Sequence, residues 1–180
     1  RSLLRQQHGG SEPNLCLADF VRPLSMGKKD TIGVFCTTAQ VPIVDASSDP
    51  YASLLSQTIA DRLAEASAEL MHLEVRRSYW GYAPHESLSI EDLLSERFQG
   101  IRPAVGYPSM PDTSLNFVLD SLIDFSSIGV HLTENGMMRP HASVSGIMLA
   151  HPEARYFALG PSGEDQLEDY ARRRGVPTGY

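Results

Sequence analysis

The chain has 180 residues, of which 42% are hydrophobic, enough for one globular domain with its own core over residues 1–180. Its formal net charge of −7 argues against a general nucleic-acid binder, because binding along a phosphate backbone needs a basic surface. The apolar runs are short and residues 1–7 lack the apolar region of a secretion signal, so the sequence predicts no membrane span and a cytoplasmic protein.

The first half of the chain predicts one strand and one long helix. Residues 1–14 are polar and contain glycine, which indicates the end of a helix followed by a mobile entry segment. Residues 31–38 are β-rich with partial alternation and predict a strand. Ser48-Asp49-Pro50 combines capping side chains with a proline in the first turn, which is typical of a helix start. The helix then runs to about Arg77 on apolar residues at helical spacing: Leu54, Leu55, Ile59, Leu63, Ala66, Leu70 and Leu73.

The second half mixes short helices with short strands. Ser89 and Asp92 form a capping pair for a second helix that ends before Gly100. Further helices are predicted at about 114–124 and at 163–174, the last one acidic at its start and basic at its end. Strands are predicted at 130–133, 136–138, 143–151 and 156–159. Because strands and helices do not alternate regularly, the predicted class is α+β with antiparallel strands.

No set of side chains in the sequence predicts a metal site. Cys16 and Cys36 have no metal-ligand spacing and lie among apolar residues, which favours reduced core thiols; a disulfide between them is the alternative. Glu69-x-x-His72 matches the spacing of di-iron helices, but that chemistry needs a second such helix. The histidines of the second half share no ligand spacing: His131, His141 and His151.

The long helix carries three carboxylates on one stripe. Asp61, Glu65 and Glu69 follow one another at i, i+4 spacing, where like charges repel by a few tenths of a kcal/mol each. The stripe is therefore either a solvated helix face or a surface that binds something.

Residues 100–112, called the Arg-Pro loop below, are the most informative part of the sequence. With two glycines, three prolines and one arginine they cannot continue a helix, and they predict a rigid, extended loop. Arg102 offers a guanidinium fork to a carboxylate or phosphate, Gly106 lets a ligand approach the backbone, and Tyr107 adds a flat face. A proline-rich connector with a solvated arginine is the competing interpretation.

Two aromatic groups also have two interpretations. Tyr156-Phe157 fits either a strand with one ring in the core or a pair of rings against a planar ligand. The cluster at residues 79–82, Tyr-Trp-Gly-Tyr, is typical of a core anchor at a helix end.

The Arg-Pro loop resembles the Arg-Pro-x-x-Gly-Tyr-Pro-x-x-Pro-Asp motif of the activation domain of cobalamin-dependent methionine synthase, a module that binds S-adenosylmethionine (AdoMet). Other blocks similar to this family follow the same order and extend from Leu15 to Gly175. They are residues 16–21, 60–66, 79–84, 142–146 and 166–173.

The resemblance implies a fold in which helices pack around a twisted antiparallel sheet. It implies a module that presents AdoMet for reductive methylation of cob(II)alamin, with an electron from flavodoxin or a similar donor, and without a complete active site of its own. Cobalamin would be carried by a partner domain or protein. The resemblance implies AdoMet contacts at Glu65, Arg102, Ala104, Gly106, Tyr107, Tyr156 and Phe157, and contacts with the corrinoid domain at Asp61 and Tyr107.

The sequence also departs from the family. Thr113 stands where a histidine is common, and Phe157 where a second tyrosine is common. The domain is expected to be shortened at its N-terminus, where the family places the aspartate that receives the amino group of AdoMet. The alternative function is therefore a degenerate interaction module that caps a corrinoid protein without binding AdoMet.

Overall fold

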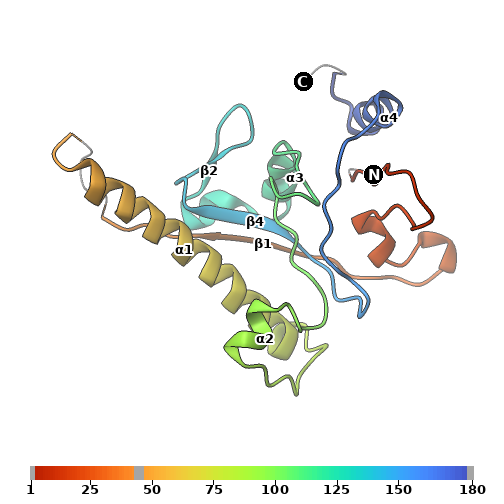
Figure 1. Ribbon diagram of the computed structural model, residues 1–180, viewed down its shortest axis with the longest axis horizontal. Coiled ribbons are helices and arrows are strands. Elements are labelled where there is room, and N and C mark those ends of the chain that lie inside the picture. Colours follow the sequence, from red (N-terminus) through yellow and green to blue (C-terminus); the bar gives the residue numbers. More distant parts are fainter. Residues whose placement is uncertain (1–2, 43–46, 178–180) are drawn as a thin grey trace.

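A computed structural model describes residues 3–42 and 47–177. Its regular elements are β1 (Gly33–Thr38), α1 (Pro50–Glu74), α2 (Ile90–Leu94), α3 (Leu115–Ile123), β2 (His131–Leu132), β3 (Met138–Arg139), β4 (Ser143–Met148) and α4 (Glu164–Arg174). Figure 1 shows the long α1 crossing β1 and β4, with α2 near its C-terminal end and α4 beside the N-terminal segment. Helices and antiparallel strands together confirm the predicted α+β class.

The central sheet is a β1–β4 pair that is covered on both faces. The two strands are antiparallel, with Gly33 opposite Met148 and Thr38 opposite Ser143. Because alternate residues of a strand face opposite sides, Phe35 packs with α1 while its neighbour Cys36 belongs to the cluster that contains the α3 leucines. The sheet thus separates two cores, and α1 lies on one side of it.

The Arg-Pro loop runs along the free edge of β4. Ile101 exchanges two backbone hydrogen bonds of 2.9 Å with Leu149, and the Ile147 amide donates to Pro103 (3.1 Å). A Cβ at Gly146 would lie 2.2 Å from the Pro103 carbonyl oxygen, so only glycine permits this approach. The sequence prediction of an extended loop is confirmed for residues 101–104, whereas residues 105–109 form turns. The glycine partner in β4 explains how the extended part is fixed to the sheet.

Helix α1 begins and runs as predicted, but it buries a different face. Asp49 caps it by accepting from the Ala52 amide (3.0 Å). Its buried apolar residues are small and spaced by four, namely Ala60, Ala64 and Ala68, and the last two pack against the strands. Most of the leucines on which the helix was predicted, and Ile59, are largely exposed, with Leu54 at 66% and Leu70 at 60%, while Leu73 is half-buried. Small residues let the helix backbone approach the strands closely, as the 3.1 Å hydrogen bond from Thr37 Oγ1 to the Ala64 carbonyl shows.

A buried ion pair fixes the C-terminal end of this helix. The chain continues through a π-helical turn, Val75–Tyr79, and Arg76 within it is completely buried. Its guanidinium pairs with Glu86 at 2.7 Å and lies 4.4 Å from the centre of the Phe98 ring. The predicted second helix is real but short, since the segment after Leu94 turns irregularly toward Gly100.

Three sequence predictions need correction or completion. Residues 3–14 form no helix: Arg5 is bridged to Cys16 and ion-paired with Asp19 (2.5 Å). Residues 156–159 form no strand, because the amide of Leu159 bonds to the carbonyl of Pro108 (2.9 Å) in the loop instead. Cys16 and Cys36 are both buried as free thiols, and burial raises the pKa of Cys36 to about 11. Among the described residues, no helix has the length and apolar character needed to cross a membrane.

Candidate functional site

A cavity of about 460 Å³ opens between α1, the Arg-Pro loop and the segment around Tyr156. Phe35 of β1 and Val144 of β4 form part of its lining, so the cavity lies on the α1 side of the sheet. Six of the seven residues predicted to contact AdoMet line it: Glu65, Arg102, Ala104, Tyr107, Tyr156 and Phe157. The fold therefore gathers in one place residues that are up to 92 positions apart in the sequence, counting from Glu65 to Phe157.

The guanidinium of Arg102 is held by α1. One Nη2 N–H donates to Glu69, and Nη1 lies 3.3 Å from Nδ1 of His72, so both members of the Glu-x-x-His pair face the arginine. The guanidinium carbon is also 5.7 Å from the centre of the Phe98 ring. The Arg102 side chain is 19% exposed, so it is mostly buried but still accessible from the cavity. This contradicts the interpretation of the loop as a connector with a solvated arginine.

His72 is fully buried and its tautomer follows from its neighbours. Burial first, and then the positive charges of Arg76 and Arg102, lower the pKa of His72 to about 3. The ring is therefore neutral. A guanidinium has only donors, so Nδ1 must accept from Arg102, and the proton on Nε2 donates to the Tyr82 hydroxyl at 3.2 Å. Through this hydrogen bond Tyr82, and with it the aromatic cluster at residues 79–82, supports His72, which in turn contacts Arg102.

Tyr107 brings Glu65 to the edge of the cavity. Gly106 has φ +87°, a conformation that favours glycine, and the turn it forms directs Tyr107 toward α1. The phenol donates to Glu65, and burial together with this hydrogen bond raises the pKa of Tyr107 to about 12. The phenol is thus protonated at neutral pH and Glu65 is its acceptor. Gly106 itself is absent from the cavity lining, so its contribution is to shape the turn.

Tyr156 and Phe157 line the cavity without belonging to a strand. The Tyr156 hydroxyl accepts the Arg102 amide at 2.9 Å, and burial raises the pKa of this phenol. Asp61 lies outside the cavity lining, 3.5 Å from His141. The stripe predicted on α1 is therefore divided: Glu65 and Glu69 face the Arg-Pro loop, and Asp61 faces the segment before β4.

Sequence reasoning missed Glu96, a further carboxylate at the cavity that Arg102 lines. It lines the cavity and has φ +55°, a conformation that non-glycine residues rarely adopt. The residue had been placed inside a predicted helix, where its side chain would have been unremarkable. No local sequence pattern announces a positive φ at glutamate, so only the structure reveals this position.

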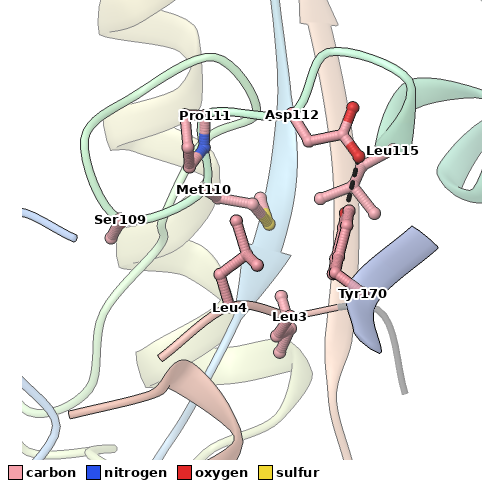
Figure 2. A pocket seen from close by; sticks show the side chains of 8 residues that line it. All are labelled: Leu3, Leu4, Ser109, Met110, Pro111, Asp112, Leu115 and Tyr170. Carbon is pink, nitrogen blue, oxygen red and sulfur yellow. Dashed lines mark hydrogen bonds between the residues drawn. The ribbon is translucent and has the colours of Figure 1, made fainter. Parts of the chain in front are cut away.

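The other end of the Arg-Pro loop is attached to α4. Figure 2 shows Asp112 joined to Tyr170, with the side chain of Leu4 pointing toward Met110. The Tyr170 hydroxyl donates to Asp112 at 2.5 Å, the Ser114 amide donates to it at 2.9 Å, and Arg174 Nη1 lies 3.6 Å away. The space between these residues is only about 10 Å³, room for about one water. This end of the loop is packed rather than open.

Within residues 3–42 and 47–177, no three metal-ligating side chains are grouped so that they could hold a metal ion. Two of the acidic residues near the cavity are engaged by the protein, Glu69 by Arg102 and Glu65 by Tyr107. The arrangement suits an organic ligand that carries both an anionic and a cationic group.

Comparison with known proteins gives two findings. A family model described as "Vitamin B12 dependent methionine synthase, activation domain" matches residues 1–175. A solved structure, described as a crystal structure of the MetH reactivation domain bound to AdoHcy (S-adenosylhomocysteine), is 44% identical with a TM-score of 0.91. The match covers 98% of this chain and 57% of that chain, so this chain spans little more than half of that longer protein.

Proposed function

This chain belongs to the family of vitamin B12 dependent methionine synthase activation domains, and we propose that it binds AdoMet and presents it for reductive methylation of cob(II)alamin. In this function the chain restores the methylated form of a corrinoid cofactor that a partner domain or protein carries. The electron comes from a flavodoxin-like donor. The observation that carries the proposal is the cavity at the Arg-Pro loop. Its lining combines one arginine, Arg102, and two carboxylates, Glu65 and Glu96, with the aromatic pair Tyr156-Phe157.

The cavity fits the ligand in size and in chemistry. Its volume of about 460 Å³ is within the range of roughly 300–1,000 Å³ typical of small-molecule sites. The Arg102 guanidinium is the group that binds the methionyl carboxylate, because it can make two parallel charge-assisted hydrogen bonds. Glu65 and Glu96 supply negative charge for the ammonium and sulfonium groups, and Tyr156 and Phe157 pack against the adenosine.

The work of the chain in this function is positioning. AdoMet supplies an electrophilic methyl group that reacts only with a strong nucleophile, so the protein needs no general acid or base. Arg102 holds the carboxylate of the ligand and Glu65 attracts its cationic groups, and Ala104 leaves room beside the backbone. Asp61 and Tyr107 lie at the edge where the corrinoid domain docks.

Calorimetric titration with AdoMet and S-adenosylhomocysteine tests the proposal. The chain is expected to bind both, while adenosine alone, which has no amino-acid part, binds more weakly. The absence of heat at millimolar AdoMet would favour the alternative, a module that caps a corrinoid protein without binding AdoMet.

A further inference from the structure

We propose that Glu69 is a positioning residue for the ligand site: it fixes the Arg102 guanidinium from behind, so that the remaining N–H groups face the cavity. The inference rests on the proposed function and adds a residue that the family resemblance did not assign. Glu69 is absent from the cavity lining, whereas its partner Arg102 lines the cavity.

The hydrogen bonds of Arg102 leave the fork available. A guanidinium carries five N–H groups. One is donated to Glu69 and one is directed at His72 Nδ1, so three remain for a ligand. Both protein acceptors lie on α1, three positions apart and therefore on one helix face. The Phe98 ring at 5.7 Å limits movement on a further side.

Glu69 is not arranged for maximal stability. Its Oε1 is buried and has no hydrogen-bond partner, although Oε2 contacts Arg102. A buried carboxylate oxygen without a partner is destabilising. A residue kept only for folding would be expected to satisfy both oxygens, so this arrangement favours a function in holding Arg102.

The sign of the effect on binding follows from the charges. The ligand places an ammonium and a sulfonium beside its carboxylate, so its net charge is positive and the negative charge of Glu69 attracts it as a whole. Removing Glu69 also frees the Arg102 side chain, which must then be ordered again on binding. Both effects weaken AdoMet binding. S-adenosylhomocysteine has no sulfonium charge and should be affected only by the loss of order.

The test compares Glu69→Gln with Glu74→Gln, a matched change on the same helix outside the cavity lining. Glu69→Gln is expected to weaken AdoMet binding about three- to tenfold and S-adenosylhomocysteine binding about two- to threefold. It should leave 5′-methylthioadenosine, which lacks the amino-acid part, unchanged. In an Arg102→Ala background the same substitution should no longer weaken S-adenosylhomocysteine binding, because there is no guanidinium left to order, and the loss for AdoMet should shrink to the part that comes from the charge. Equal losses for all three ligands, or AdoMet binding as tight as in the wild type, would overturn the proposal.

A second measurement needs no ligand. In the wild type the Arg102 Nη protons should give separate NMR signals, because contacts with Glu69 and His72 slow rotation of the guanidinium; in Glu69→Gln they should average. Identical signals in both proteins would overturn the proposal even if AdoMet binds. If instead the wild type binds no AdoMet, the proposed function fails, and the NMR comparison still decides whether Glu69 holds Arg102. Glu69→Asp, which keeps the charge on a shorter side chain, provides the same comparison if the Gln variant folds poorly.

Discussion

The two ends of the Arg-Pro loop are held by different helices and in different ways. At the first end, Arg102 contacts Glu69 and His72 of α1 beside a cavity of about 460 Å³. At the second end, Asp112 is enclosed by Tyr170 and Arg174 of α4, beside a space of about 10 Å³. Both ends combine an arginine with a carboxylate. Only at the first end does the arginine, Arg102, line a cavity large enough for a ligand.

This difference separates a binding site from a clamp. The Asp112 carboxylate contacts a phenol, a backbone amide and a guanidinium, all of them groups of the protein itself. It is therefore not available to a ligand. Arg102 uses only two of its five N–H groups in contacts with protein side chains, those to Glu69 and His72. Substitutions at the second end should therefore act on folding, and substitutions at the first end on ligand affinity.

The largest effect is expected for Asp112→Ala. The change leaves the Tyr170 hydroxyl without its acceptor and removes the negative charge 3.6 Å from Arg174, whose side chain is only 8% exposed and keeps its hydrogen bond to Ser114 Oγ. We expect a loss of about 2–4 kcal/mol in the free energy of unfolding and a fall in Tm of about 5–10 °C. Chemical denaturation measures the first and calorimetry the second.

Tyr170→Phe is the control for this variant. It removes one donor and keeps the ring, so it should cost about 1 kcal/mol. If Asp112→Ala proved no less stable than the wild type, the α4 end of the loop would not be a clamp.

Arg102→Lys should produce the next largest effect, and on a different property. Lysine keeps the charge but cannot form the fork, so AdoMet affinity should fall by about 1.5–3 kcal/mol, or roughly ten- to a hundredfold. The unfolding free energy should change by less than about 1 kcal/mol, because Glu69 is 31% exposed and water can replace part of the contact. Titration calorimetry and thermal unfolding on the same sample separate the two quantities. A large fall in Tm with unchanged affinity would reverse the assignment of the two ends.

The two ends should also respond to acid in different pH ranges. The folded-state pKa of His72 is about 3 against an ordinary value of 6.5, so the unfolded chain takes up the proton first. Stability is complete above about pH 6.5 and falls as the pH drops toward 3, by about 1.5 kcal/mol between pH 6.5 and 5. His72→Gln should flatten the stability profile in that range.

At Asp112, burial raises the pKa, but hydrogen bonds from Ser114 and Tyr170 and the charge of Arg174 outweigh it and hold the pKa below the ordinary 3.8. The stability that this carboxylate contributes is present above pH 3.8 and is lost as the pH falls below it. Urea unfolding at pH 7, 6, 5 and 3.5 resolves the two ranges. A wild-type profile that is flat from pH 7 to 5 would contradict the neutral state of buried His72.

The sequence predicted the loop and its arginine because proline, glycine and a lone charge are local signals. It predicted α1 from helical spacing but assigned the wrong buried face, since alanines that pack closely on a sheet carry less weight in a hydrophobicity pattern than exposed leucines. Glu96 was missed because its positive φ depends on how the chain leaves α2. The contacts of Glu69 with Arg102 join positions 33 residues apart, which no spacing rule relates.

Tyr107→Phe is expected to have the smallest effect and therefore gives the finest test of the open end. The substitution keeps the ring and removes the hydrogen bond to Glu65, whose charge remains. Since Tyr107 is 47% exposed, water can take over the bond, and the unfolding free energy should change by less than about 0.5 kcal/mol. AdoMet affinity should fall only about twofold, the cost of ordering one freed carboxylate side chain. Glu65→Gln removes the charge itself, so it should weaken AdoMet more than S-adenosylhomocysteine, a preference that Tyr107→Phe should not show. If Tyr107→Phe weakened AdoMet as strongly as Arg102→Lys, the phenol would contact the ligand directly rather than act through Glu65.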